Sequence, residues 1–257
     1  MRVRQNPKTV QKGELAAEWA TLAPAWIQAT AGGENVNRDG LLDAWMLRAI
    51  GEVAGRDVID LGCGEGRFCR MLTRRGARVV GIDLCQPFIE FAEAHRFGNE
   101  RYLVADIEDL SALPSAGFDL AVSYLSLVDV ADFAAVVQEA YRLLRAGGRF
   151  VVCNLQSMNT GIKTTGSPWL KDKEGRKLHF LLDDYLDEGP RAMPMFGHVV
   201  TNFHRTLSTY INSFLQTGFA LEGLQEPTPS PAQLARYPEL ADNLRVPYFI
   251  IYLLRKA

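Results

Sequence analysis

Short apolar runs alternate with amphipathic stretches between residues 55 and 154. The runs typical of strands cover residues 56–61, 78–83, 101–105, 118–123 and 149–154. The stretches with helical spacing between them cover residues 67–75, 87–96 and 131–145. Nearly continuous apolar strands that alternate with helices are typical of a parallel sheet covered on both faces. The pattern therefore predicts an α/β fold for this part of the chain.

The alternation stops after this segment and returns later in the chain. Residues 155–203 carry Gly, Pro and Trp at irregular spacing, which predicts an insertion over one end of the sheet. Such an insertion can be a lid that closes on a ligand or a dimer interface. A helix over 206–216 and strands over 219–224 and 248–254 follow, and we expect the two strands to form an antiparallel pair at the sheet edge. Residues before 55 are typical of amphipathic helices.

Composition and charge limit the classes of partner. The 257-residue chain has 47% hydrophobic and 23% charged residues, as an ordinary globular protein has. Its formal charge of −2 gives no sign of the basic stripe typical of nucleic-acid binding. Its longest apolar run, 248–254, is far shorter than the about 20 residues of a membrane span. Residues 1–12 lack the apolar segment of a signal peptide, so we expect a cytoplasmic protein without a nucleic-acid or membrane partner.

The cysteines and histidines give no metal or disulfide pattern. The four cysteines contain no CxxC pair, and the four histidines match no HExxH pattern. A chain of this length can bury its own core without a disulfide framework. We therefore predict neither a disulfide framework nor a metal site.

The stretch VIDLGCGEGR, residues 58–67, ends a predicted strand on an acid and follows it with three glycines at alternate positions. Glycine permits positive φ and close approach of a ligand to the backbone. A dinucleotide fingerprint G-x-G-x-x-G requires a glycine where this chain has Arg67, and the Lys-Ser/Thr of a phosphate-binding Walker A loop is absent. The alternatives are a tight turn without a ligand and a site for a small ligand on Gly62, Cys63 and Gly64.

Two further acids favour the ligand site. Asp83 ends the second predicted strand about 20 residues after the first glycines, where a carboxylate can accept both ribose hydroxyls. Asp106 and Ile107 follow the third strand, where the acid can accept a hydrogen bond from an adenine amino group and the isoleucine can pack on the ring. Because ligands bind outside the carboxyl ends of parallel strands, we expect these residues to share one site.

The order and spacing of these motifs resemble the class I S-adenosylmethionine-dependent methyltransferases. The matching segments are VIDLGCGEGR (58–67), VVGIDL (79–84), ADI (105–107), FDLAVSYLSLVDV (118–130) and EAYRLLRAGGRFVV (139–152). The resemblance implies a Rossmann-like three-layer sandwich with a mostly parallel seven-stranded sheet. It implies S-adenosyl-L-methionine as the cofactor and S-adenosyl-L-homocysteine as the product. We predict one domain in four parts, namely an N-terminal helical lid (1–54), a cofactor-binding core (55–154), an inserted cap (155–203) and a C-terminal helix with edge strands (204–257).

The resemblance also implies roles for individual residues. The glycine turn would approach the methionine part of the cofactor. Asp83 would bind the ribose, and Asp106 with Ile107 would hold the adenine. Ser123 and Tyr124 would flank the methyl-donor centre. The residues predicted to bind the cofactor are Arg38, Asp60, Gly62, Cys63, Gly64, Asp83, Leu84, Asp106, Ile107 and Ser123.

The methyl acceptor is predicted by exclusion and by a second resemblance. The [DNS]-P-P-[YFW] motif of DNA amino-methyltransferases and the Pro-Cys nucleophile of cytosine-C5 enzymes are both absent. Residues 202–227 are similar to a bacterial branch with the pattern HR-x-L-x-x-Y-I…GF…EP, which is usually assigned to small-molecule methylation and has a type 11 or 25 methyltransferase domain. We therefore expect transfer to O or N of a small organic acceptor by a monomer or homodimer.

Candidates for the acceptor side carry alternatives. His204 can accept a proton from a hydroxyl near neutral pH, or it is a structural or capping histidine. Tyr124 is the second catalytic candidate. Arg205 is expected to pair with a carboxylate or backbone carbonyl, and Trp19 and Trp26, which share a helical face, are core or lid residues.

Arg38 lies in the turn NRDG before a predicted helix. Its guanidinium can bind the methionine carboxylate, or the turn is solvated and Asp39 caps the helix.

Two other functions stay open at this point, a nicotinamide-dependent oxidoreductase and a non-catalytic S-adenosylmethionine-binding module.

Overall fold

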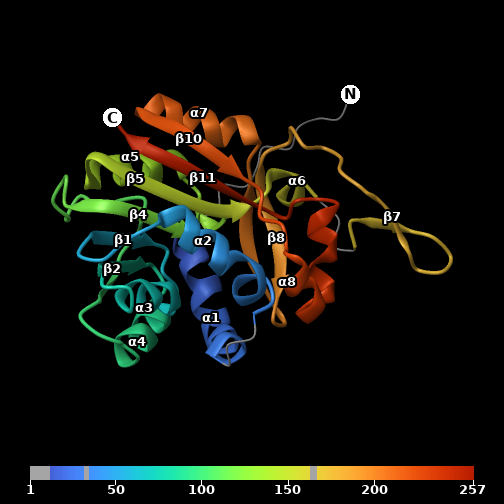
Figure 1. The fold of residues 1–257 in the computed structure, drawn as a ribbon, viewed down its shortest axis with the longest axis horizontal. Helices are drawn as coiled ribbons and strands as arrows, with labels where there is room; N and C mark the ends of the chain where they lie inside the picture. Colours follow the sequence, from blue (N-terminus) through green and yellow to red (C-terminus); the bar gives the residue numbers. More distant parts are fainter. Residues whose placement is uncertain (1–11, 32–34, 163–166) are drawn as a thin grey trace.

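The computed structural model describes residues 12–31, 35–162 and 167–257. Within them, seven strands form one sheet in the order β10-β11-β5-β4-β1-β2-β3 (Figure 1). They are β1 (Asp57–Leu61), β2 (Arg78–Asp83), β3 (Arg101–Val104), β4 (Phe118–Tyr124), β5 (Leu144–Leu155), β10 (Phe219–Gln225) and β11 (Phe249–Lys256). β1 to β5 run parallel, whereas β11 runs antiparallel to β5 and β10. The predicted α/β fold with an antiparallel last pair is confirmed.

Helices cover both faces of this sheet, as the apolar strands require. Those that follow the strands are α3 (Arg67–Thr73), α4 (Gln86–Ala94), α5 (Phe133–Leu143) and α7 (Leu207–Thr217). Buried side chains of α5 and α7 pack on one face, and those of α3 and α4 contribute to the cluster on the other face. Each observed helix begins and ends within two residues of the predicted range. The sheet is therefore the middle of three layers.

The caps of these helices explain their bounds. Asp132 accepts a hydrogen bond from the amide of Ala135 at the start of α5, and Thr206 accepts one from Thr209 at the start of α7. Gly218 ends α7 with a φ of 107°, a conformation that glycine adopts without strain. α5 ends at Leu143, two residues before the end of the predicted helical range, and Gly147 and Gly148 lie in the irregular first part of β5.

The described N-terminal segment is helical. It forms α1 (Lys12–Ala31), a π-helical turn η1 (Arg38–Leu42) and α2 (Asp43–Ile50). The rings of Trp19 and Trp26 meet edge to face on α1 at a centroid distance of 5.9 Å, and both lie close to Phe88 of α4. Residues 1–11 of the predicted lid lie outside the described residues. The aromatic contacts hold α1 against α4.

The predicted cap contains two hairpins and a short helix. They comprise α6 (Ser157–Thr160), β6 (Trp169–Lys171), β7 (Lys177–Phe180), β8 (Gly189–Met195) and β9 (His198–His204), and residues 163–166 lie outside the described residues. The β6–β7 hairpin projects from the body of the molecule (Figure 1). The β8–β9 hairpin packs against α1, where the Glu18 carboxylate accepts hydrogen bonds from the amide and hydroxyl of Thr201. This hairpin and α1 therefore form one cover.

The connection between β10 and β11 contains α8 (Pro231–Arg236) and the 3-10 turn η3 (Pro238–Leu244). Ser230 and Gln233 form a reciprocal capping box at the start of α8. The side chain of Gln233 also donates to the carbonyl of Gly40, which ties α8 to η1. Among the described helices, none combines the length and apolar character needed to cross a bilayer.

Candidate functional site

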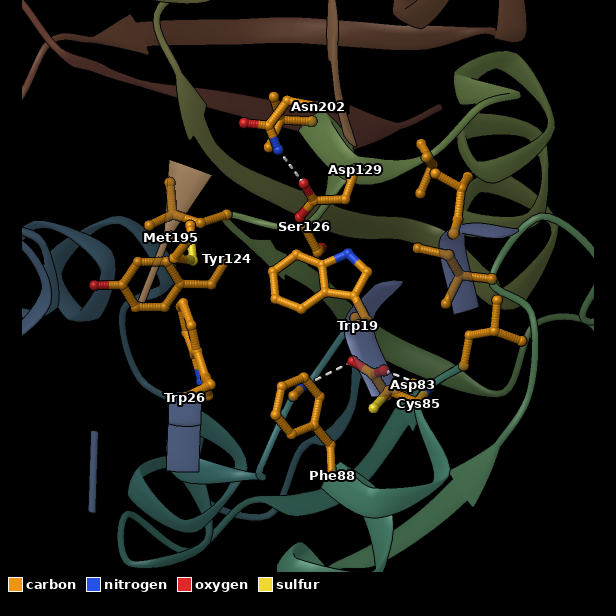
Figure 2. A pocket seen from close by; sticks show the side chains of 18 of the residues that line it. Trp19, Trp26, Asp83, Cys85, Phe88, Tyr124, Ser126, Asp129, Met195 and Asn202 are labelled. Atoms are coloured by element: carbon orange, nitrogen blue, oxygen red, sulfur yellow. Dashed lines mark hydrogen bonds between the residues drawn. The ribbon is translucent and has the colours of Figure 1, made fainter. Parts of the chain in front are cut away.

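A cavity of about 390 Å³ opens where the parallel strands end, within the range of small-molecule sites. Its strand-end half is formed by residues at the carboxyl ends of β1, β2 and β3, including Gly64, Asp83 and Ile107. Its cap half is formed by residues from α1, from the segment after β4 and from the β8–β9 hairpin, namely Trp19, Trp26, Asp129, Met195, Phe196 and Asn202. Figure 2 shows Asp83 and Asp129 on opposite sides of this space.

The three glycines of the turn after β1 are required for different reasons. All have positive φ, which is 77° at Gly62, 54° at Gly64 and 78° at Gly66. A Cβ on Gly62 would lie 2.3 Å from the Cβ of Ser126, and one on Gly66 would lie 2.6 Å from the hydroxyl of Tyr102. A Cβ on Gly64 would meet no atom within 4 Å. Gly62 and Gly66 are therefore fixed by the packing of the protein, whereas Gly64 faces open space at the cavity.

Asp83 connects two adjacent strand ends at the wall of the cavity. One carboxylate oxygen accepts a hydrogen bond from the amide of Gly64 and the other accepts one from the amide of Cys85, both at 2.8 Å. Burial raises the pKa of Asp83 to about 6, while these two amide hydrogen bonds act in the opposite direction. Because each carboxylate oxygen can accept more than one hydrogen bond, Asp83 can still receive hydroxyl donors from a ligand. Leu84 beside it also lines the cavity.

Asp60, Cys63 and Ser123 lie behind the turn and do not line the cavity. Asp60 is 1% exposed, and its Oδ1 has no hydrogen-bond partner among the described residues. Its Oδ2 accepts a hydrogen bond from the thiol of Cys69, and burial raises its pKa to about 7. Ser123 shares a hydrogen bond of 2.7 Å with Ser126, and it is Ser126 that reaches the cavity. These three predicted residues support the site from behind.

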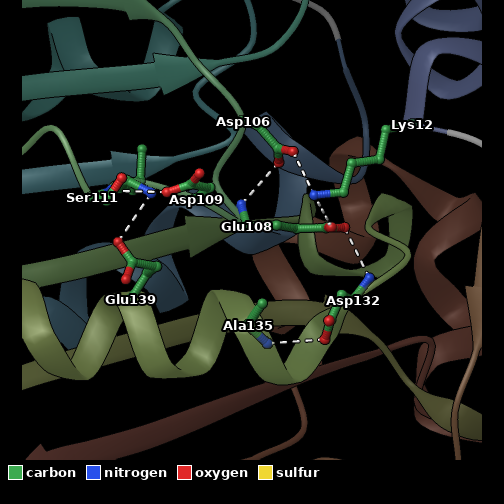
Figure 3. A network of polar contacts seen from close by, with 9 residues as sticks. Lys12, Asp106, Glu108, Asp109, Ser111, Asp132, Ala135 and Glu139 are labelled. Carbon is green, nitrogen blue, oxygen red and sulfur yellow. Dashed lines mark hydrogen bonds and ion pairs between the residues drawn. The ribbon is translucent and has the colours of Figure 1, made fainter.

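Asp106 and Ile107 line the strand-end half, as expected from their place after β3. The ammonium of Lys12, at the start of α1, lies 2.8 Å from Asp106 and 2.7 Å from Glu108 (Figure 3). These two hydrogen bonds raise the pKa of Lys12. Glu108 also accepts a hydrogen bond from the amide of Asp132, the residue that caps α5. The start of α1 is thus tied to the end of β3 at the rim of the cavity.

Arg38 and Arg67 have opposite environments although they lie close in the fold. Arg67 forms ion pairs with Asp39 and Asp43, so its charge is balanced within the protein. Arg38 lines the cavity, with its guanidinium carbon 4.7 Å from the ring centroid of Trp26, and no ion pair to it occurs among the described residues. Asp39 therefore pairs with Arg67 and does not cap α2, whose N-cap residue is Leu42, and Arg38 is left facing the cavity.

Tyr124 contributes its ring to the cavity, but its hydroxyl is used elsewhere. The hydroxyl donates a hydrogen bond of 3.0 Å to Asp43 on α2 and points away from the centre of the cavity (Figure 2). Burial raises the pKa of this phenol well above its usual value. A phenol held in this way is a poor proton acceptor, so the geometry does not favour the predicted catalytic role of Tyr124.

His204 lies outside the cavity. Its Nδ1 lies 2.8 Å from the hydroxyl of Thr160, and its Nε2 lies 2.7 Å from the carbonyl oxygen of Tyr185, so both ring nitrogens have partners within the cap. The residue is fully buried, and burial lowers the pKa of its imidazole. The structure therefore favours the alternative that His204 is a structural histidine.

Arg205 holds the segment that follows β4. Its guanidinium donates hydrogen bonds to the carbonyl oxygens of Leu127, Val130 and Ala131. This is the expected pairing with backbone carbonyls. It fixes the 3-10 turn η2 (Leu127–Asp129), which brings Asp129 into the cavity.

The sequence prediction missed several polar groups of the cavity, among them Asn202, Asp129 and Glu65. The amide of Asn202, on β9, donates a hydrogen bond to Asp129 (Figure 2), and burial raises the pKa of Asp129 well above its usual value. Glu65, which is 4% exposed, lines the cavity beside the glycine turn and accepts a hydrogen bond from the indole of Trp26. The signal for Asp129 was an acid between apolar residues soon after a strand end.

Aromatic and sulfur-containing side chains close the cap half. The ring of Phe196, at the tip of the β8–β9 hairpin, lies 5.9 Å from that of Trp26, and Met195 lines the same wall. Phe196 and Gly197 form a two-residue turn with φ values of 48° and 81°. Positive φ is unfavourable for a bulky residue, so this conformation is held by its surroundings. The site therefore combines acids and backbone groups on one side with an apolar wall on the other.

Comparisons with known proteins agree with this geometry. Residues 59–152 match a family described as a methyltransferase domain. The chain is 32% identical to a ubiquinone biosynthesis O-methyltransferase of Psychrobacter cryohalolentis, over 63% of this chain and 67% of the relative. It is 30% identical to a malonyl-[acyl-carrier protein] O-methyltransferase of Serratia marcescens, over 78% of this chain and 74% of the relative. A solved S-adenosylmethionine-dependent methyltransferase from Mesorhizobium loti superposes with a TM-score of 0.74 at 36% identity, over 85% of this chain and 99% of that one.

Proposed function

The chain belongs to the S-adenosylmethionine-dependent methyltransferases, and we propose that it methylates an oxygen or nitrogen atom of a small organic acceptor. The observation that carries this proposal is the cap half of the cavity, whose apolar wall lies beside the strand-end half. A cavity of about 390 Å³ is of the size that binds small molecules.

The strand-end half fits the cofactor that the family uses. Asp83 can accept hydrogen bonds from two ribose hydroxyls. Ile107 offers an apolar face to the adenine ring, and Asp106 offers a hydrogen-bond acceptor to its amino group. Gly64 leaves open space where the methionine part would approach, and the unpartnered Oδ1 of buried Asp60 lies behind that turn. When bound, S-adenosylmethionine supplies an electrophilic methyl group on a sulfonium sulfur.

Two charged side chains would hold the amino-acid end of the cofactor. Arg38 has no ion-pair partner among the described residues, and a guanidinium suits bidentate binding of a carboxylate. Glu65 lines the cavity next to the glycine turn and can accept hydrogen bonds from an ammonium group. Arg67 cannot take the role of Arg38 because Asp39 and Asp43 already pair with it.

The chain would accelerate the reaction by position and by exclusion of water. An electrophile and a nucleophile fixed in contact react far faster than the same groups in dilute solution. The cover made of α1 and the β8–β9 hairpin, held by Glu18 and Thr201, closes the space around the two reactants. Exclusion of water also prevents loss of the methyl group to hydrolysis.

The first experiment tests cofactor binding. Calorimetric titration with S-adenosylmethionine and S-adenosylhomocysteine is expected to show tight binding to the wild type and at least tenfold weaker binding to Asp83→Asn. The matched control is Asp109→Asn, which removes a carboxylate that lies outside the cavity. Equal affinity in all three proteins would contradict the proposed cofactor site.

The second experiment tests the size of the acceptor. The enzyme and methyl-tritiated S-adenosylmethionine are incubated with a bacterial extract that is then separated by ultrafiltration. We expect enzyme-dependent label in the small-molecule fraction. Label found only in nucleic acid or protein would overturn the small-acceptor assignment.

A further inference from the structure

We propose that Asp129, held by Asn202, accepts the proton of the acceptor, and that the acceptor is a neutral or cationic molecule with an apolar body and not an anion. The inference deepens the proposed function and rests on it, because it concerns the cap half of the same cavity. It follows from where Asp129 lies, what holds it, and which charges surround it.

Asp129 faces the cavity from a fixed support. It lies at the end of η2, and Arg205 donates to three backbone carbonyls of this segment, at Leu127, Val130 and Ala131. Its side chain accepts a hydrogen bond from Asn202, which is itself 4% exposed. No second hydrogen bond to the carboxyl group comes from the described residues. One oxygen is therefore positioned by the protein and the other is left for a ligand.

The other candidates for proton acceptance in the cap half have partners. The hydroxyl of Tyr124 donates to Asp43, and Ser126 donates a hydrogen bond of 2.5 Å to the carbonyl of Leu61. His204 does not line the cavity and has partners at both ring nitrogens. Among the polar side chains of the cap half that the structure describes, Asp129 is thus the acid or base that remains for the acceptor.

The charges around the cap half disfavour an anionic acceptor. Among the residues that the structure describes, the cations that line the cavity are Lys12, which pairs with Asp106 and Glu108, and Arg38, which we assign to the carboxylate of the cofactor. The guanidinium of Arg205 is directed at backbone carbonyls. An anion would therefore enter beside the Asp129 carboxyl without a free cation from the described part of the chain to pair with it, and charge burial without a partner is costly.

The environment of Asp129 also suits proton transfer. Burial raises its pKa, and the nearby charge of Asp83 acts in the same direction. The hydrogen bond from Asn202 and the charges of Arg38 and Arg205 oppose this rise. A carboxylate with a raised pKa binds a proton more tightly than an exposed one, which improves its action as a general base near neutral pH.

The step balances in atoms and charge. The acceptor oxygen or nitrogen forms a bond to the methyl carbon, and the sulfur–methyl bond breaks with its electron pair left on sulfur. A neutral hydroxyl or amine attacks with its own lone pair and gives its proton to the Asp129 carboxylate. A cationic acceptor first gives its ammonium proton to this carboxylate, which frees the nitrogen lone pair for the attack. A sulfonium and a carboxylate thus become a thioether and a carboxylic acid, and the proton later leaves to water.

The experiment uses three probes that share one ring and differ in charge, namely benzylamine, benzyl alcohol and benzoate. Their binding to the complex of the enzyme with S-adenosylhomocysteine is measured by ligand-observed NMR and calorimetry at pH 7. We expect benzylamine and benzyl alcohol to bind the wild type at least tenfold more tightly than benzoate. Asp129→Asn should lower the affinity for benzylamine at least tenfold and change the affinity for benzyl alcohol by less than threefold. Asp109→Asn should change neither affinity.

Proton release gives a readout that a structural role alone would not move. Calorimetry in phosphate and in Tris measures the protons exchanged when benzylamine binds. We expect greater proton release from the wild type than from Asp129→Asn, because an ammonium favours the ionised form of the acid. Equal release from both proteins would contradict the inference.

The outcomes separate the inference from the proposed function. Failure of the wild type to bind S-adenosylhomocysteine would refute the proposed function. Normal binding of this product together with equal binding of benzoate and benzylamine would refute the inference alone. This comparison needs no variant, and Asp129→Ser provides a second variant if Asp129→Asn does not fold.

Discussion

The two halves of the cavity are built in different ways. The strand-end half consists of backbone groups and short acids at the ends of neighbouring strands, and the amides of Gly64 and Cys85 orient Asp83. The cap half is assembled from side chains of separate elements, as in the bond from Asn202 on β9 to Asp129 on η2. A site made of backbone in a central sheet tolerates little change, whereas a site made of side chains on a cover can change its partner without loss of the fold.

This difference predicts the largest effect at the glycine turn. Gly62→Ala places a Cβ 2.3 Å from that of Ser126 at a φ of 77°, so we expect a loss of about 3 kcal/mol of stability and no measurable binding of S-adenosylhomocysteine. Thermal unfolding measures the loss of stability, and calorimetry measures the binding of S-adenosylhomocysteine.

Gly64→Ala is the matched comparison, because its Cβ meets open space. Its φ of 54° costs about 1–2 kcal/mol, so the protein should fold but bind S-adenosylhomocysteine at least tenfold more weakly. Equal stability losses in the two variants would break the distinction between packing at Gly62 and ligand approach at Gly64.

The second prediction concerns pH. Burial raises the pKa of Asp60 to about 7 and that of Asp83 to about 6, above the ordinary value near 4. Such acids contribute stability that is fully present below the ordinary pKa and lost as pH rises through 6 and 7. At about 1.4 kcal/mol per pKa unit, the melting temperature of the free protein should fall by about 5–10 °C between pH 5 and pH 8.

Two controls sharpen this prediction. Asp60→Asn removes the larger of the two shifts, so its melting temperature should depend less on pH. Saturating S-adenosylhomocysteine should also reduce the fall, since ribose hydroxyls favour the ionised form of Asp83. A melting temperature that rises from pH 5 to pH 8 in the free protein would contradict the assigned burial of both acids.

The same difference explains what could be predicted from the sequence. The glycines, Asp83, Asp106 and Ile107 lie at strand ends that the apolar pattern marks, and parallel topology brings such ends together. Asn202 and Asp129 are 73 residues apart in the chain, and nothing local records that they meet. Their contact depends on how the β8–β9 hairpin packs, which the irregular composition of residues 155–203 did not indicate.

The HR pair at 204–205 illustrates the same limit. A histidine next to an arginine near a predicted acceptor site is compatible with catalysis or with support. The structure distinguishes them through contacts with Thr160 and Tyr185, which lie 44 and 19 residues from the histidine. Periodicity cannot report such contacts.

The third prediction compares two arginines near the border of the halves. Arg38→Ala should weaken S-adenosylmethionine binding by about 10- to 150-fold, because a charged hydrogen bond contributes about 1.5–3 kcal/mol. Stability should change little, since Arg38 has no ion-pair partner among the described residues.

Arg67→Ala provides the contrast. It leaves Asp39 and Asp43 without their shared partner, so it should lower the melting temperature more than Arg38→Ala does. Calorimetry and thermal unfolding of both variants are the measurements. If the two variants are equally stable and Arg67→Ala weakens cofactor binding as strongly as Arg38→Ala does, the assignment of Arg38 to the carboxylate is wrong.

The smallest expected effect lies in the cap half, at the tip of the β8–β9 hairpin. Phe196 has a φ of 48° in a turn where Asn followed by Gly is preferred, so Phe196→Asn should raise stability by about 0.5–1 kcal/mol. The same change removes the ring that meets Trp26, so benzyl alcohol should bind the complex with S-adenosylhomocysteine several-fold more weakly, while S-adenosylhomocysteine itself binds as before. Opposite changes in stability and in probe binding would mean that the strained residue is kept for the acceptor. A loss of stability would instead show that Phe196 serves the packing of the cover, and the two halves would then differ less than we infer.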